Sequence, residues 1–240
     1  MSSAAHALEN IACWQYRQED WHSIQDTIAP EQEVSLYWHD QLAAALLAFP
    51  SGLSSLCLGH AWLELCRPGE TPGLDAQQGE SFYLSVRNAR KDLDLHAPEP
   101  QLTPEATLAL RNDFMRRPGK WDHTGCFHRA GVYDPQEHRF LTTTEDIGRH
   151  NCLDRLAGWS LTENVNLRTT VLMVTARATA SLVEKAVRAG FPILVSQSAV
   201  TTLAVDKAQQ AGLTLVGFVR EHRLTVFTDP HHRILRDAGS

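Results

Sequence analysis

The sequence has no apolar run long enough to cross a membrane. Its apolar stretches, such as residues 171–174 and 192–195, have the length of a strand, whereas a spanning helix needs about 20 residues. Residues 1–10 also lack a basic region followed by an apolar run, which is the pattern of a secretory signal. Together these absences favour a cytoplasmic protein without a membrane partner.

Closely spaced cysteines are absent as well. The five cysteines stand at positions 13, 57, 66, 126 and 152, and no two have the two-residue spacing of a redox or zinc motif. The sequence therefore offers no metal framework. We expect reduced thiols, most of them buried as small apolar side chains.

Positive charge is not in excess. The 240 residues carry a formal net charge of −6, and no long run of Lys and Arg offers a surface for a phosphate backbone, so a nucleic-acid partner is not expected. Hydrophobic residues make up 43% and charged residues 21%, the usual composition of a globular protein. The length allows one large core or two joined lobes.

The first part of the chain has the mixed pattern of an α+β lobe. A lack of periodicity and two prolines place a lobe boundary within residues 92–101, which predicts an N-terminal lobe at 1–98 and an α/β domain at 99–240. In the N-terminal lobe we expect strands at 33–38, 42–49 and 81–86, a helix at 54–66 and a polar loop at 70–79.

The second part alternates regularly between strands and helices. Thr103 and Pro104 have the types favoured at the N-cap and first position of a helix, which we expect to end near Met115. Strands are then predicted at 140–144, 171–175, 193–196, 214–219 and 223–228, and helices at 148–161, 181–189 and 201–211. Short connections between these elements predict a parallel or mixed sheet with right-handed crossovers.

Three strand-to-helix junctions carry polar side chains. Ligands of such sheets bind at the carboxyl ends of strands, where helix N-termini attract anions. Arg149 and His150 lie at the first junction, whose acidic residues are also explained by helix capping. Arg177, at the second, can bind a phosphate or can simply cover the sheet edge. Ser198, at the third, is explained more simply by capping.

One cysteine has histidines close to it in sequence. Cys126 lies between His123 and His128, and a Cys–His pair can form a nucleophile if the side chains meet. An inert thiol is the alternative. From the residues alone, the prediction is an α/β protein with an anion or nucleotide site.

Several segments resemble one known family. Residues 145–151 (EDIGRHN) resemble the EDxGRHN signature of FdhD proteins, and residues 124–128 (TGCFH) resemble their TGGxH segment. Arg177 and Ala178, followed by residues 182–186 (LVEKA), resemble the SGRxS…VxKA element. Residues 196–199 and 213–220 are similar to the closing elements, so the resemblance is most specific at 121–228.

The resemblance implies a two-lobed, usually dimeric protein with a cytidine-deaminase-like α/β domain. Members of the family are thought to receive sulfur as a persulfide from a cysteine desulfurase. They pass it to the molybdenum of the bis-guanine-dinucleotide cofactor that is destined for formate dehydrogenase, and GDP mimics this cofactor. The residues implied to surround its phosphate or guanine are Arg149, His150, Arg177, Ser198, Phe218, Val219, Arg220, Glu221, His222 and Arg223.

One family motif is missing. Members carry a CGxCG loop after the strand that corresponds to residues 81–86, but here residues 87–92 read RNARKD. We favour a divergent member that binds cofactor without carrying sulfur. The alternatives are a sulfurtransferase that uses Cys126 as its catalytic thiol, and a ligand-free chaperone of a molybdoenzyme. A deaminase is not expected, because the His-x-Glu and Cys-x-x-Cys zinc motif is absent.

Overall fold

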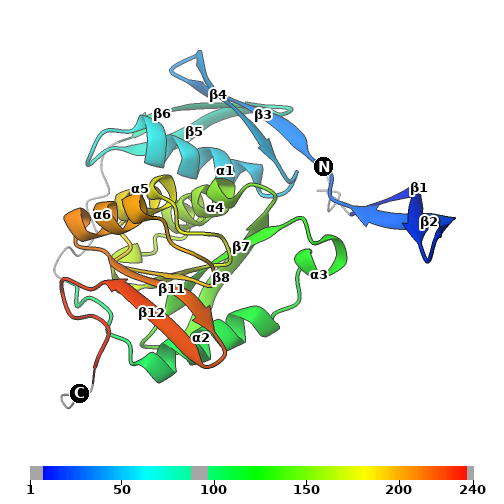
Figure 1. The fold of residues 1–240 in the computed structure, drawn as a ribbon. Helices are drawn as coiled ribbons and strands as arrows, with labels where there is room; N and C mark the ends of the chain where they lie inside the picture. The colour runs from blue at the N-terminus through cyan, green and yellow to red at the C-terminus, as the bar shows by residue number, and fades with distance from the viewer. Residues whose placement is uncertain (1–7, 88–96, 237–240) are drawn as a thin grey trace.

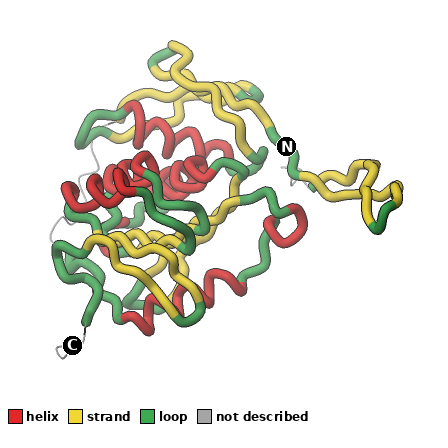
Figure 2. The backbone as a smooth tube through the Cα atoms, in the orientation of Figure 1, coloured by secondary structure: helices red, strands yellow, loops and turns green. Residues whose placement is uncertain are grey.

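The computed structural model describes residues 8–87 and 97–236. They form an α/β protein with layers of strands, helices, strands and a final helix (Figure 2). Much of the predicted lobe boundary lies outside the described residues, so the division into lobes stays a prediction, as does the likeness to cytidine deaminases. In the described part of the chain, no helix is both long and apolar enough to cross a bilayer.

The second half contains a mixed sheet of six strands in the order β12-β11-β10-β9-β7-β8. Strands β9, β10 and β11 are mutually parallel, whereas β7 and β12 run against their neighbours. The bounds are β7 His128–Asp134, β8 Arg139–Asp146, β9 Val171–Val174, β10 Ile193–Ser196, β11 Thr214–Arg220 and β12 Arg223–Thr228. The strand directions confirm the prediction of a mixed sheet with a parallel core.

Helices cover both faces of this sheet (Figure 1). Helices α4 (Arg149–Thr162), α5 (Ala180–Ala189) and α6 (Thr202–Ala211) lie on the face toward the first half, and α2 (Pro104–Arg116) lies on the other face. Alternate residues of β9 and β10 enter the two apolar clusters, which explains why Val171–Val174 and residues 193–195 are all apolar. The predicted cap of α2 is confirmed, because Thr103 Oγ1 accepts a hydrogen bond from Ala106 N at 3.1 Å.

The first half contains a sheet of four strands in the order β4-β3-β6-β5. One of its faces packs on α1 (Leu53–His60), which continues as a short π-helix, η1 (Ala61–Leu65). The strand bounds are β3 Gln32–Trp38, β4 Gln41–Ala48, β5 Thr71–Gln78 and β6 Ser81–Arg87. Three of these strands and the helix confirm the sequence prediction.

The polar loop predicted at 70–79 is wrong. These residues form β5, which pairs antiparallel with β6 at the edge of the sheet. Pro72 and Gly73 suggested a loop, but an edge strand tolerates proline because one side of its backbone has no partner strand. Leu74 packs against the apolar cluster beneath the sheet and anchors the strand there.

Five elements were not predicted from the sequence, and they are strand β7, whose bounds are given above, the two strands of a hairpin, a short helix and a 3₁₀ turn. Strands β1 (Glu9–Arg17) and β2 (Asp20–Ile28) form a hairpin that extends away from the body of the molecule (Figure 1). Helix α3 (Trp121–Thr124) precedes β7, and a 3₁₀ turn, η2 (Leu167–Thr169), precedes β9. Each is short or consists of one hairpin, so its periodic signal in the sequence is weak.

The two halves meet where α1 crosses α4 through a pair of glycines. A Cβ atom on Gly59 would lie 1.6 Å from the carbonyl oxygen of Asp154, and one on Gly158 would lie 1.9 Å from that of Ser55. Both contacts are to backbone, which cannot move aside as a flexible side chain can. The absence of side chains at these two positions therefore allows the helices to approach closely.

Replacing Gly158 by Ala is expected to push α1 and α4 apart and to lower the free energy of unfolding by about 3 kcal/mol, the upper part of the range for overpacking. Urea denaturation monitored by circular dichroism measures this change. Gln209→Ala, at an exposed position of α6, is the control and should change the free energy by less than about 0.5 kcal/mol. A similarly small change for Gly158→Ala would contradict the proposed close helix contact.

Candidate functional site

The strand order brings the predicted junctions to one edge of the six-stranded sheet. Strands β8, β9, β10 and β11 all end there, and the antiparallel strand β7 begins there. We call this side the carboxyl edge. It receives the start of α4, the loops after β9 and β10, the turn between β11 and β12, and the segment between α3 and β7. Segments separated by up to about 100 residues in sequence thus converge because of sheet topology.

A cavity of about 280 Å³ lies at this edge. Its walls come from the end of α2, from α3, and from the strand ends of the six-stranded sheet. The lining residues are Met115, Trp121, Asp122, Phe127, His128, Arg129, Thr175, Gln197, Ser198 and Arg220. Ser198 and Arg220 were predicted from the sequence, whereas the contribution of α2 and α3 was not.

Two further predicted residues, Arg149 and Arg177, lie near this cavity. Burial lowers the pKa of His128, and the positive charges of Arg149 and Arg177 lower it further, against the opposing effect of Asp146. Cationic side chains from two junctions therefore lie within electrostatic range of one lining residue. Arg149 is half-buried and its Nε has no hydrogen-bond partner within residues 8–87 and 97–236, while Arg177 is exposed.

His150 contacts helix α5 and is not among the residues that line the cavity. Its Nε2 lies 2.9 Å from Ser181 Oγ, at the start of α5. Burial lowers the pKa of His150, with Arg149 and then Lys185 adding to the decrease. The imidazole therefore favours its neutral form and links the beginnings of α4 and α5.

The predicted stretch at residues 218–223, which spans the end of β11 and the start of β12, divides between core and surface. Val219 is fully buried in the apolar cluster beneath α2, so its side chain serves packing. Phe218 is half-buried, has a φ of 50°, and donates a backbone hydrogen bond to Ser198 O at 2.9 Å. Arg220 donates from its guanidinium to Gln197 O. Glu221, His222 and Arg223 are exposed at the tight turn that begins β12.

Asp146 and Asn151 of the EDIGRHN segment have structural contacts. Asp146 is fully buried, and its carboxylate accepts hydrogen bonds from Gly148 N at 2.9 Å and from Asn151 Nδ2 at 2.9 Å. It also pairs with Arg155, whose Nη2 lies 2.6 Å away. Arg149 and His150 are thus presented by a helix start that these buried contacts hold in place.

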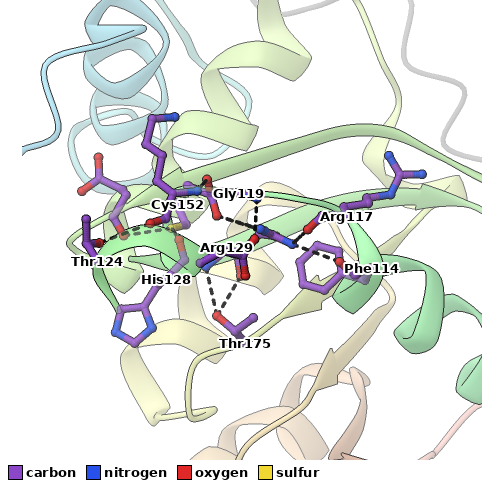
Figure 3. A network of polar contacts seen from close by, with 12 residues as sticks. Phe114, Arg117, Gly119, Thr124, His128, Arg129, Cys152 and Thr175 are labelled. Carbon is purple, nitrogen blue, oxygen red and sulfur yellow. Dashed lines mark hydrogen bonds and ion pairs between the residues drawn. The ribbon is translucent and has the colours of Figure 1, made fainter. Parts of the chain in front are cut away.

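A second buried ion pair positions the cavity wall (Figure 3). The guanidinium of Arg129 donates to Glu145 Oε1 from Nη2 at 2.9 Å and from Nε at 3.1 Å. Its Nη1 donates to the backbone oxygens of Phe114 at 3.1 Å and Arg117 at 2.7 Å, at the end of α2. Glu145 Oε2 accepts from Lys120 N at 2.8 Å. The pair therefore joins β7 and β8 to the segment that leads into α3.

The sequence analysis missed this arrangement. Arg129 and Glu145 are register partners on β7 and β8, so their side chains lie side by side on one face of the sheet. Because β7 was not predicted, the sequence patterns could not bring the two residues together. Gly119 lies directly against this ion pair. A side chain at position 119 would collide with it, because a Cβ atom there would lie 1.8 Å from Arg129 Nη2.

Cys126 is exposed at the carboxyl edge. Its backbone N–H donates to Thr124 Oγ1 at 3.1 Å, and Gly125 before it has a φ of 66°. Within the described residues, the structure shows no hydrogen bond between its thiol and an imidazole. The predicted Cys–His pair thus remains without a contact to support it, although the thiol is accessible. In the same part of the chain, no three His, Cys, Asp or Glu side chains converge as a metal site.

Comparison with known proteins places these features in a family. A model of the FdhD/NarQ family matches residues 70–235, which include the carboxyl edge and all of its cavity. This chain belongs to the FdhD/NarQ family.

Relatives within the FdhD/NarQ family support the assignment. The chain is 39% identical over 164 residues to the sulfur carrier protein FdhD of Streptomyces avermitilis, an alignment that covers 68% of this chain and 57% of the relative. It is 25% identical over 265 residues to FdhD of Bacillus subtilis, covering 96% and 98% of the two chains. The chain thus spans little more than half the length of the first relative.

The FdhD/NarQ fold is also seen in a solved structure. A candidate formate dehydrogenase accessory protein from Desulfotalea psychrophila superposes with a TM-score of 0.80, over 95% of this chain and 99% of that one. The sequence identity is 21%, so the comparison establishes the fold. The overall fold of this chain is therefore a known architecture.

Replacing Arg129 by Met is expected to lower the free energy of unfolding by about 3 kcal/mol or more, because it leaves the Glu145 carboxylate buried without its cation. The double variant Arg129→Met/Glu145→Gln should be destabilised less than the single variant. Urea denaturation of both variants and of Glu145→Gln gives the coupling free energy. Strictly additive effects would contradict a buried ion pair that holds this wall.

Proposed function

We propose that this protein is an accessory protein of formate dehydrogenase maturation that binds the molybdenum bis-guanine-dinucleotide cofactor at its carboxyl edge. The observation that carries the proposal is the cavity bounded by Ser198 and Arg220, with the cationic Arg149 and Arg177 beside the same His128. Family membership supplies the class of client, because relatives are named sulfur carrier protein FdhD and a structural neighbour is described as a formate dehydrogenase accessory protein.

The helix starts at this edge suit the phosphates of such a ligand. Gly148 and Thr179 are the N-cap residues of α4 and α5. Within the described residues neither makes a side-chain cap, and neither helix has an acidic residue in its first turn. Their first backbone N–H groups and the positive ends of their dipoles are therefore available to an anion. The buried Nε of Arg149 adds a donor that the described residues leave unused.

The cavity walls suit one base of the ligand. Its volume of about 280 Å³ is at the lower limit for small-molecule cavities, which favours a single base over the whole dinucleotide. Trp121, Phe127 and Met115 provide apolar surface for the face of a base, while Gln197 and Asp122 offer polar groups for its edge. In this arrangement the remainder of the cofactor lies along the carboxyl edge, toward Arg177 and Arg223. The bound cofactor supplies the molybdenum, which is cargo for the client enzyme.

Sulfur transfer by the family's cysteine pair is not part of this proposal. The CGxCG motif is missing from the sequence. Burial raises the pKa of Cys57 to about 12 and that of Cys66 to about 11, and it also raises the pKa of Cys152. These three thiols are therefore poor nucleophiles. Cys126 is the one exposed cysteine in the described part of the chain, which makes it the candidate if sulfur is carried at all.

The proposed partners follow from this role. Formate dehydrogenase is the client, and a homodimer is the expected form of the protein. A cysteine desulfurase is a partner only in the alternative in which Cys126 receives sulfur. A ligand-free chaperone for a molybdoenzyme is the alternative in which the cavity binds no nucleotide.

Arg177→Ala is expected to weaken the binding of GDP about 10- to 100-fold, the effect of losing one or two charge-assisted hydrogen bonds. Isothermal titration calorimetry of the wild-type protein and the variant measures this change. Arg139→Ala is the matched control, because Arg139 is an exposed arginine that begins β8 at the opposite edge of the sheet. If the wild-type protein binds no GDP, the nucleotide proposal is wrong and the chaperone alternative is favoured.

Incubation with a cysteine desulfurase and cysteine is expected to load no more persulfide on the wild-type protein than on Cys126→Ser, because the paired cysteines are absent. Release of thiocyanate on treatment with cyanide measures the bound sulfur. A persulfide that forms on the wild-type protein and disappears in Cys126→Ser would instead establish Cys126 as the sulfur carrier.

A further inference from the structure

Arg149 lies within electrostatic range of two histidines, His128 and His150. His128 begins β7 and lines the cavity, and His150 follows Arg149 in the first turn of α4. Both side chains are half-buried. We call these two residues the histidine pair. The pair therefore belongs to the electrostatic surroundings of the proposed ligand site.

Positive charge surrounds each member of the histidine pair. Burial lowers the pKa of His128, and Arg149 and Arg177 lower it further. Burial likewise lowers the pKa of His150, with Arg149 and Lys185 adding to the decrease. The positive ends of the α4 and α5 dipoles act in the same direction. The free protein thus keeps two neutral imidazoles among cations, because protonating either one would add like charge to the cluster.

The acid that opposes this effect at His128 already has a cation of its own. Asp146 raises the pKa of His128, but its effect is smaller than those of burial and the two arginines. The Asp146 carboxylate is fully buried, pairs with Arg155 at 2.6 Å, and accepts hydrogen bonds from Gly148 N and Asn151 Nδ2. It is therefore fully engaged and offers no free counterion to an imidazolium at position 128.

The acids near His150 are engaged in the same way. Asp154 on α4 and Glu64 on η1 raise the pKa of His150, with smaller effects than the neighbouring cations. Both carboxylates pair with Lys185 Nζ, at 2.6 Å and 3.0 Å respectively. Asp154 also lies 3.1 Å from the ring of His60 on α1. An imidazolium at position 150 would therefore have to compete with these partners for a counterion.

A bound anion supplies the counterion that the histidine pair lacks. The proposed ligand site places phosphates at the starts of α4 and α5, beside the buried Nε of Arg149. Negative charge there offsets the cations that keep the imidazoles neutral. We propose that the protein binds its phosphate ligand together with protons from the solvent, which the histidine pair takes up. This inference rests on the proposed function, because it concerns the same anion site.

The contacts of His150 accommodate an added proton. Its Nε2 lies 2.9 Å from Ser181 Oγ, and a hydroxyl oxygen can accept a hydrogen bond from a protonated ring nitrogen. Ser181 Oγ lies in turn 3.3 Å from Thr179 Oγ1, to which the hydroxyl hydrogen can then be donated. His150 thus keeps its link to α5 in either protonation state. Its charge can change without movement of the two helix starts.

His128 meets the ligand from the side of the cavity. Its ring points away from the buried ion pair of Arg129 and Glu145 (Figure 3), and it lines the same cavity as Ser198 and Arg220. A ligand that places its base in this cavity and its phosphates at the helix starts therefore passes close to both histidines.

Proton uptake makes the affinity depend on pH in one direction. A ligand that raises the pKa of a histidine binds more tightly as the pH falls from the pKa of the complex to that of the free protein, and its affinity is constant outside this window. The free pKa of each histidine lies below its ordinary value, so the window extends to the acidic side of that value. A rise of about one unit for one imidazole makes binding about 10-fold tighter at the acidic end.

Such a site carries more positive charge with its ligand than without it. A permanent cluster of two arginines and two imidazolium groups would repel itself in the free protein. Charges that appear only on binding avoid this cost. Release of the ligand then returns the protons to the solvent, so a more basic environment favours release.

Calorimetric titration of the full chain with diguanosine diphosphate tests the proposal. The pyrophosphate of this ligand is a diester, so the ligand itself has no group that titrates near neutral pH. The wild-type protein should bind it about 10- to 100-fold more tightly at about pH 5.5 than at about pH 8, for one or two coupled histidines. Titrations in two buffers of different ionisation enthalpy should show net uptake of protons.

The variant His128→Gln/His150→Gln should bind with the same affinity at both pH values and without proton uptake, because an amide takes up no proton. His39→Asn/His138→Asn is the matched control and should retain the pH dependence of the wild-type protein. Both control positions are exposed in turns and have a positive φ, which asparagine adopts readily.

Nuclear magnetic resonance of the wild-type imidazole protons gives the pKa values without any variant, and both should rise when the ligand is added. Equal affinity at the two pH values without proton uptake would overturn the inference and leave the nucleotide site intact. Uptake that persists in His128→Gln/His150→Gln would also overturn it, because other groups would then take the protons. Absence of binding at either pH would overturn both the inference and the proposed function.

Discussion

The buried carboxylate of Asp146 is the contact on which the arrangement of the two halves and of the candidate site depends. Its oxygens accept from Gly148 N, Asn151 Nδ2 and the Arg155 guanidinium, so an otherwise costly buried charge is fully paired. Arg155 also donates to the backbone oxygens of Phe49 and Ser51, at the end of β4. One network thus holds the start of α4 and the first half of the chain together.

This network extends through α4 to neighbouring elements. Asn151 Nδ2 donates to Leu47 O at 2.8 Å, and one turn further on, Asp154 pairs with Lys185 of α5 at 2.6 Å and with His60 of α1 at 3.1 Å. Gly158 then allows the close approach of α1. Successive turns of α4 therefore contact the four-stranded sheet, helices α5 and α1, and the carboxyl edge. Polar contacts set the relative position, and the glycine pair sets the distance.

The second ion pair, Arg129 with Glu145, has the same role for the cavity wall. It uses the otherwise unpaired carbonyl oxygens at the end of α2 and the N–H of Lys120, so α2 and α3 are fixed relative to β7. The acidic residues of the EDIGRHN segment are thereby directed inward. What remains for a ligand is the cationic part, with Arg149 beside His128 and Arg177. Burial of Asp146 and of the Glu145 ion pair leaves Arg149, Arg177 and Arg220 as the cationic groups of this edge, where Asp122 and Glu221 are the remaining acids of the lining and the turn.

The sequence by itself determined most elements of the second half, because buried parallel strands and amphipathic helices with caps leave clear local patterns, as Thr103 and Gly212 show. It also determined the family, through the segment at 145–151.

Only the tertiary structure decided which residues meet. Val219 proved to be core and Asn151 a link between halves, and Arg129, Met115 and Trp121 joined a cavity that no local pattern indicates. The reason is physical, since strand order and register bring distant residues together while periodicity reports only on neighbours along the chain. The edge strand at 71–78 was missed for the same reason, because its pairing with β6 outweighs the loop propensity of its proline and glycine.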